Sequence, residues 1–113
     1  MKRIIVILAL VASAAFSADM TGNWTFEVES SAGSGSPKFA LKQNAEKISG
    51  KYSGQLGEAE VKGSVKGKAV VIEFEVQGAK VIYEGTLDES GTTIKGKVDL
   101  AGQATGTFTG KKS

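Results

Sequence analysis

The feature that most constrains this chain is a strict alternation of apolar and polar residues from Gly22 to the C-terminus. A period of two places one set of side chains on the buried face of a β-strand and the other set in solvent. No segment shows a sustained helical period. Eight segments alternate, at residues 24–28, 38–42, 48–54, 59–65, 70–76, 81–87, 94–100 and 104–110. The sequence therefore predicts an all-β domain of eight strands.

The connectors between these segments are too short for parallel pairing, which needs long crossovers. Most are turn-like, at residues 44–47, 55–58, 67–68, 78–79, 88–93 and 101–103. Ser30–Pro37 differs, because it is rich in Gly and Ser, and we expect a flexible loop there. The pattern predicts an eight-stranded antiparallel up-and-down (meander) β-barrel, whose closure removes both sheet edges. A flattened sandwich is the main alternative.

A five-residue phrase with an inward glycine at its centre recurs at Gly50, Gly63, Gly85 and Gly96, with a weaker copy at Gly106. Two interpretations compete. Inward glycines permit the sharp coiling of strands in a small barrel, or they leave a hollow girdle for a ligand. Pairing inward with inward residues predicts one lateral row, made of Leu41, Gly50, Gly63, Ile72, Gly85, Gly96 and Phe108.

The N-terminus has the layout of a secretory signal peptide. Lys2 and Arg3 precede an apolar run at residues 4–12, and small residues follow up to Ala18. The run is shorter than the ~20 residues of a membrane-spanning helix. We expect residues 1–18 to be removed and 19–113 to form one domain, periplasmic or secreted, with no membrane span.

The composition of residues 19–113 excludes several function classes. Without Lys2 and Arg3 the domain has twelve basic and twelve acidic residues, which gives no reason to expect a nucleic-acid partner. The chain contains no Cys and no His, which excludes disulfides, thiol nucleophiles and His-based relays or metal sites. Glutamates such as Glu60 and Glu73 fall on the outward face. We therefore expect no enzyme, no cofactor and no metal.

Gly22-Asn23-Trp24 opens the first strand as a Gly-x-Trp motif. Followed by an eight-stranded meander, it resembles the calycin group, the lipocalins and avidin-like proteins, and also short secreted bacterial domains of similar texture. The lipocalin resemblance implies that Trp24 plugs a closed end and that Ser30–Pro37 covers an open end as a lid. The arginine that covers this tryptophan in lipocalins is absent, and Lys111 or Lys112 would replace it. A single Trp and few inward polar groups make biotin an unsuitable ligand.

The predicted function is an exported binding module that holds a small apolar molecule inside the barrel. The candidate ligand-binding residues are the inward aromatic side chains, with Trp24 as floor and the two tyrosines as hydrogen-bond donors. They are Trp24, Phe26, Phe39, Tyr52, Phe74, Tyr83 and Phe108. The alternative is a filled barrel that recognises a protein partner, or serves the cell envelope structurally, through its uncharged loop end.

Overall fold

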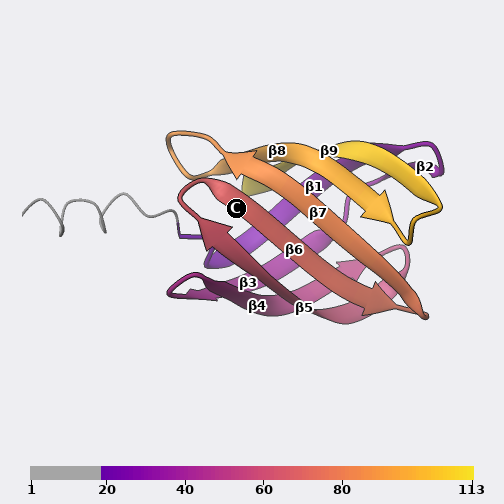
Figure 1. Ribbon diagram of the computed structural model, residues 1–113, viewed down its shortest axis with the longest axis horizontal. Helices are drawn as coiled ribbons and strands as arrows, with labels where there is room; N and C mark the ends of the chain where they lie inside the picture. The colour runs from indigo at the N-terminus through magenta and orange to yellow at the C-terminus, as the bar shows by residue number, and fades with distance from the viewer. Residues whose placement is uncertain (1–18) are drawn as a thin grey trace, which may run out of the picture.

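The computed structural model describes residues 19–113, which fold as a single antiparallel sheet (Figure 1). The predicted signal peptide, residues 1–18, lies outside the described residues. Within residues 19–113 no helix is long and apolar enough to cross a membrane. The strands are β1 (Gly22–Ser30), β2 (Gly33–Gly35), β3 (Lys38–Asn44), β4 (Lys47–Gly54), β5 (Gly57–Lys66), β6 (Ala69–Val76), β7 (Ala79–Leu87), β8 (Thr93–Leu100) and β9 (Ala104–Lys112).

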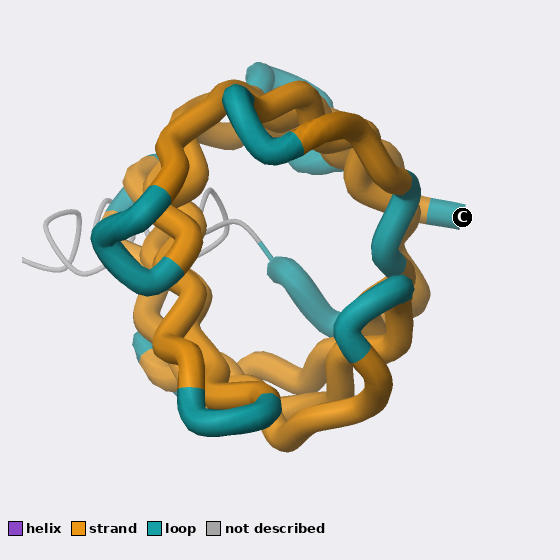
Figure 2. The backbone as a smooth tube through the Cα atoms, turned by 90° about the vertical axis from the view of Figure 1, so that its right-hand side faces the viewer, coloured by secondary structure: helices purple, strands orange, loops and turns teal. Residues whose placement is uncertain are grey.

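The sheet closes on itself because β1 pairs with β9 as well as with β2 and β3. Seen down its axis, the backbone forms a ring (Figure 2). Apart from β2 and β3, which both pair with β1, strands that follow one another in sequence pair with each other throughout the described residues. All pairs are antiparallel. The predicted up-and-down barrel is therefore confirmed, and the sandwich alternative is wrong.

The structure has nine strands rather than the expected eight because Pro37 divides the second strand of the barrel into β2 and β3. Val28 pairs with Gly35 and Thr25 pairs with Lys38, so β2 and β3 face β1 in one continuous register. Between them the Phe26 amide donates to the Pro37 carbonyl at 2.9 Å. Proline has no N–H to return the second bond of that pair. The barrel thus has eight strands, the second of which is broken at Ser36–Pro37.

The predicted flexible loop at Ser30–Pro37 is wrong for most of its length. Residues 33–35 form β2, and the turn itself contains only Ser31 and Ala32. The Ser30 hydroxyl donates to the Gly33 carbonyl and accepts from the Ala32 amide, which fixes the turn. The segment predicted as a lid is a paired hairpin that extends the barrel wall.

The inward residues of the alternating pattern form one continuous core. Every one of the seven predicted inward aromatic side chains is buried, and the part of the chain described has no buried polar or charged residue. Aliphatic residues from most strands complete the core, among them Leu41, Ile48, Val61, Ile72 and Val98. Outward positions carry the charges, which is the arrangement expected of a half-buried sheet.

The predicted lateral row is correct at four steps and wrong at two. Leu41–Gly50, Gly63–Ile72, Gly85–Gly96 and Gly96–Phe108 are partners as predicted. However, Gly50 pairs with Val61 rather than Gly63, and Ile72 pairs with Tyr83 rather than Gly85.

The physical reason is the position of two turns. The β4–β5 turn contains only residues 55–56, and the β6–β7 turn lies at Gln77–Gly78 rather than 78–79. Gln77 and Gly78 both have positive φ, 54° and 80°, as a type I′ hairpin requires. Each of these turn positions shifts the register of its strand pair by two residues from the predicted one. Because side chains alternate with a period of two, inward residues still face inward. The core set was therefore predictable although the row was not.

The inward glycines are explained by curvature. A Cβ added to Gly50, Gly63 or Gly96 would lie 1.9–2.0 Å from a carbonyl oxygen of the neighbouring strand. At Gly110 it would lie 2.6 Å from the Phe26 ring. Strands this strongly coiled bring backbone against backbone, and the aromatic rings occupy the space left over. The hollow-girdle interpretation is therefore wrong.

We predict that Gly96→Ala destabilises the barrel by about 3 kcal/mol, because the added methyl group would overlap the Glu84 carbonyl and force the β7–β8 pair apart. Gly35→Ala is the matched control. A Cβ there meets only the flexible Gln55 side chain at 3.6 Å, so we expect a change within about 0.5 kcal/mol. Urea unfolding followed by Trp24 fluorescence measures both. Equal effects of the two substitutions would contradict the curvature account.

Candidate ligand-binding site

One end of the barrel is closed by the segment that precedes β1. Met20 is fully buried, and its carbonyl accepts a 2.9 Å hydrogen bond from the Trp24 indole N–H. The Met20 amide donates to the Gln43 side chain at 2.8 Å. Figure 2 shows this N-terminal segment crossing the far end of the ring. Met20 and Trp24 together close this end and form its plug.

The last strand covers this plug with a lysine. The Lys112 ammonium lies 5.8 Å from the centre of the Trp24 ring and donates to the Asp19 carbonyl at 2.9 Å. A cation over an indole face is attracted by the ring quadrupole. Hydrogen bonds from Thr21, and secondarily the charge of Lys112, lower the pKa of the Asp19 carboxyl. Of the two lysines proposed to replace an arginine at this place, Lys112 is the one that does so.

The middle of the barrel is filled by aromatic rings. Phe26 is central, with ring centroids 4.4 Å from Phe39, 4.9 Å from Phe108 and 5.3 Å from Tyr83. Tyr52 stacks on Phe74 at 4.2 Å. Trp24 meets Phe26 edge to face at 6.4 Å. These distances are those of contacting aromatic pairs, so the seven rings form one connected stack from the plug toward the opposite end.

The opposite end holds a concave site of about 660 Å³, which we call the cup. Its lining comes from the β1–β2 hairpin, the segment that leads to β3, the β4–β5 turn and one inward residue each of β4, β7 and β8. The lining residues are Val28, Ser30, residues 32–37, Tyr52, residues 54–56, Tyr83 and Leu100. None of them carries a charge.

The rim of the cup is tied together by one side chain. The Gln77 amide group donates to the Leu56 carbonyl at 2.9 Å and so joins two neighbouring turns. Leu56 is 40% exposed, and it is the large apolar side chain that the described residues leave open to solvent. Its position at the rim of a cup lined by Val28 and Leu100 makes the entrance apolar.

Tyr52 and Tyr83 contribute the polar atoms closest to the aromatic core. Each is only 4% exposed, and among the described residues neither hydroxyl hydrogen-bonds to another protein group. A Cβ on Gly54 would lie 2.5 Å from the Tyr52 hydroxyl, which places that oxygen at the end of β4, beside the cup. Burial, and secondarily the neighbouring Tyr52, raise the pKa of Tyr83 above its ordinary value. Tyr83 therefore remains a neutral hydrogen-bond donor at physiological pH.

Of the seven predicted ligand-binding residues, only Tyr52 and Tyr83 line the cup. Trp24, Phe26, Phe39, Phe74 and Phe108 belong to the filled stack beneath it. The candidate list did not include Gln55 and Leu56, which the sequence assigned to a turn at the uncharged loop end. Leu56 is an apolar residue in a two-residue turn, and that is the sequence signal that could have identified it.

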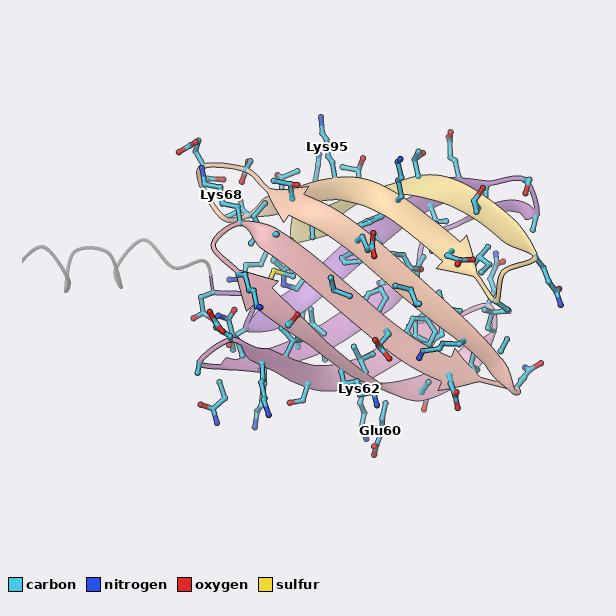
Figure 3. All side chains as sticks on the ribbon, in the orientation of Figure 1. Glu60, Lys62, Lys68 and Lys95 are labelled. Atoms are coloured by element: carbon cyan, nitrogen blue, oxygen red, sulfur yellow. The ribbon has the colours of Figure 1, made fainter. Side chains whose placement is uncertain are left out.

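The charged residues lie on the outside of the barrel. Glu60, Lys62, Lys68 and Lys95 project away from the wall (Figure 3). Lys62 faces Glu73 and Glu84 faces Lys97 across neighbouring strands. Lys80 also approaches Glu73 at 3.3 Å. Exposed pairs of this kind contribute only tenths of a kcal/mol. Among residues 19–113 no three acidic side chains gather closely enough to hold a metal ion.

No family model matches the sequence, and no curated protein sequence matches it significantly. The fold does match solved structures of redesigned β-barrels. The barrel b11L5F_LGL aligns with a TM-score of 0.70 and 16% identity, over 83% of this chain and 91% of that one. The barrel mFAP1, solved bound to DFHBI, aligns with a TM-score of 0.65 and 14% identity over 82% and 94%. The barrel mFAP0, also bound to DFHBI, gives 0.58 and 17% over 82% and 98%. The chain therefore has the fold of a small antiparallel β-barrel.

We predict that the raised pKa of Tyr83 makes the barrel lose stability in alkali. Above about pH 10 an unfolded tyrosine loses its proton while the folded one keeps it, so the free energy of unfolding falls by about 1.4 kcal/mol per pH unit. Below pH 10 this contribution is fully present. Urea unfolding from pH 7 to 11.5 tests it in the wild type and in Tyr83→Phe. The difference between the two proteins should be constant up to pH 10 and then decline. A constant difference up to pH 11.5 would show that Tyr83 titrates normally.

Proposed function

We propose that this protein is a binding module that holds one small, uncharged, largely apolar molecule in the cup. The observation that carries the proposal is a concave site of about 660 Å³ with no charged lining residue and a floor of two tyrosine side chains. Small-molecule sites are typically concave, mostly apolar and furnished with few polar groups. Because aromatic side chains fill the barrel below, the ligand sits at the mouth rather than at the centre.

The chemistry of the cup favours a neutral ligand. A carboxylate or ammonium group removed from water needs an opposite charge or several hydrogen bonds, and the lining residues provide no charge. A ligand that buries roughly 250 Å² of apolar surface gains about 6 kcal/mol at 25 cal/mol per Å². Association entropy opposes this gain. We therefore expect dissociation constants in the micromolar to millimolar range for simple aromatic compounds.

Two further observations support the proposal. Two of the similar barrels were solved bound to DFHBI, so a barrel of this size accommodates a ligand. The lining of the cup offers no carboxylate, imidazole or thiol, which favours binding over catalysis. The signal-like residues 1–18 lead us to propose that the module works outside the cytoplasm, in the periplasm or after secretion.

Native mass spectrometry of the protein, purified gently from the compartment to which it is exported, tests this function. We predict an additional mass that leaves on mild activation. Leu100→Glu places a carboxylate in the cup and should abolish that mass.

Thr107→Glu is the matched control, because Thr107 is exposed on the outer face of β9. It should retain the ligand. An apo mass for the wild type, together with no binding of the uncharged probe N-phenyl-1-naphthylamine at millimolar concentration, would refute the proposal. Equal retention by Leu100→Glu would move the site away from the cup.

A further inference from the structure

The two tyrosine hydroxyls at the floor of the cup indicate which hydrogen-bonding group a ligand there should have. Tyr52 and Tyr83 are each only 4% exposed. Among the described residues, neither hydroxyl forms a hydrogen bond with another protein group. A buried hydroxyl without a hydrogen-bond partner destabilises the folded protein, because it has lost its bonds to water. Every other buried side chain in the described part of the chain is apolar or aromatic hydrocarbon apart from Met20 and Trp24. These two oxygens are therefore the exception in an otherwise satisfied core.

Both tyrosine side chains line the same site, the cup, and their rings pack on one shared ring. Both tyrosine rings stack on Phe74, at 4.2 and 6.2 Å between centroids. After burial, the Tyr52 phenol is the second cause of the raised pKa of Tyr83. A neutral phenol donates one hydrogen bond, and a carbonyl oxygen accepts two. Two phenol donors in the lining of one site thus complement an acceptor oxygen of the ligand.

We infer that the ligand of the cup is an uncharged molecule with a ketone- or quinone-type carbonyl on a flat unsaturated framework, its oxygen accepting hydrogen bonds from Tyr52 and Tyr83. This inference rests on the proposed function. Val28, Leu56 and Leu100 contact the hydrocarbon part, since they are the larger aliphatic residues of the lining. The tyrosine rings at the floor favour a flat framework, which stacks on an aromatic surface.

An anionic acceptor fits the cup less well than a carbonyl. The lining has no lysine, and the chain after residue 3 has no arginine, so nothing there neutralises a carboxylate. The Glu27 carboxylate accepts a hydrogen bond from Ser36, a residue of the lining. A second negative charge near Glu27 would be repelled.

A pair of shape-matched probes tests the inference. In 2-acetylnaphthalene a carbonyl oxygen occupies the place of the CH₂ group in 2-isopropenylnaphthalene. We predict that the wild type, residues 19–113, binds the ketone at least ~10-fold more tightly, since each hydrogen bond contributes about 1 kcal/mol. In the Tyr52→Phe, Tyr83→Phe double variant this preference should disappear. The hydrocarbon should then bind more tightly than it does to the wild type, because it no longer buries unpaired hydroxyls.

The outcomes separate this inference from the proposed function. If neither probe binds the wild type at millimolar concentration, the proposed function itself is in error. Equal affinity of the wild type for both probes would be consistent with an apolar binding site in the cup, but it would refute the inference that the ligand carries a carbonyl group. A ketone preference that persists in the double variant would also overturn it, because the acceptor would then be held elsewhere. Thr107→Val removes a hydroxyl from the outer face of β9, so it is the matched control and should change neither affinity.

Discussion

Close contact between the backbones of neighbouring strands is the constraint on which the rest of this structure depends. A sheet of eight short strands closes only if the strands coil strongly, and strong coiling leaves no room for a Cβ at the tightest points. Gly50, Gly63 and Gly96 occupy such points, where carbonyl oxygens of the adjacent strand take the place of side chains. The glycine at the centre of the recurring five-residue motif is therefore the sequence feature that allows the barrel to close.

Closure also determines where a ligand has room. With glycines on the wall, the aromatic side chains extend across the interior and stack, from Trp24 at the plugged end to Tyr52 and Tyr83. Met20 and Lys112 complete the plug. Within residues 19–113 no segment closes the opposite end, and its turns carry uncharged residues. The barrel is thus asymmetric along its axis, with a sealed, charged end and an open, neutral one.

Much of the fold could be predicted because alternation is a direct record of which side chains face inward. Residues such as Phe26 and Ile72 were correctly placed in the core, and the antiparallel meander followed from the short connectors. Turn positions were less accessible, since a type I′ turn at Gln77–Gly78 and a type II′ turn at Gly78–Ala79 have similar signals. The strand at 33–35 was missed because Gly and Ser have low β-propensity, and its pairing depends on the β1 neighbour.

The candidate site was predictable only in part. The inward direction of Tyr52 and Tyr83 followed from alternation, but whether rings fill or line a barrel depends on their packing in three dimensions, which the sequence pattern does not contain. Lys112 could be chosen over Lys111 only once the position of Trp24 was known. Met20 precedes the alternating region, so nothing in the pattern marked it as a plug residue.

The central claim is that aromatic packing fills the barrel and leaves the cup as the place for a ligand. A crystal structure of residues 19–113 under xenon pressure tests it most directly, because xenon occupies enclosed apolar cavities. The account predicts no xenon among Phe26, Phe39 and Phe108, where the rings are in contact. Any xenon atom should lie in the cup, near Val28 and Leu100. Ordered xenon within the aromatic stack would show that the barrel is hollow and would contradict the account.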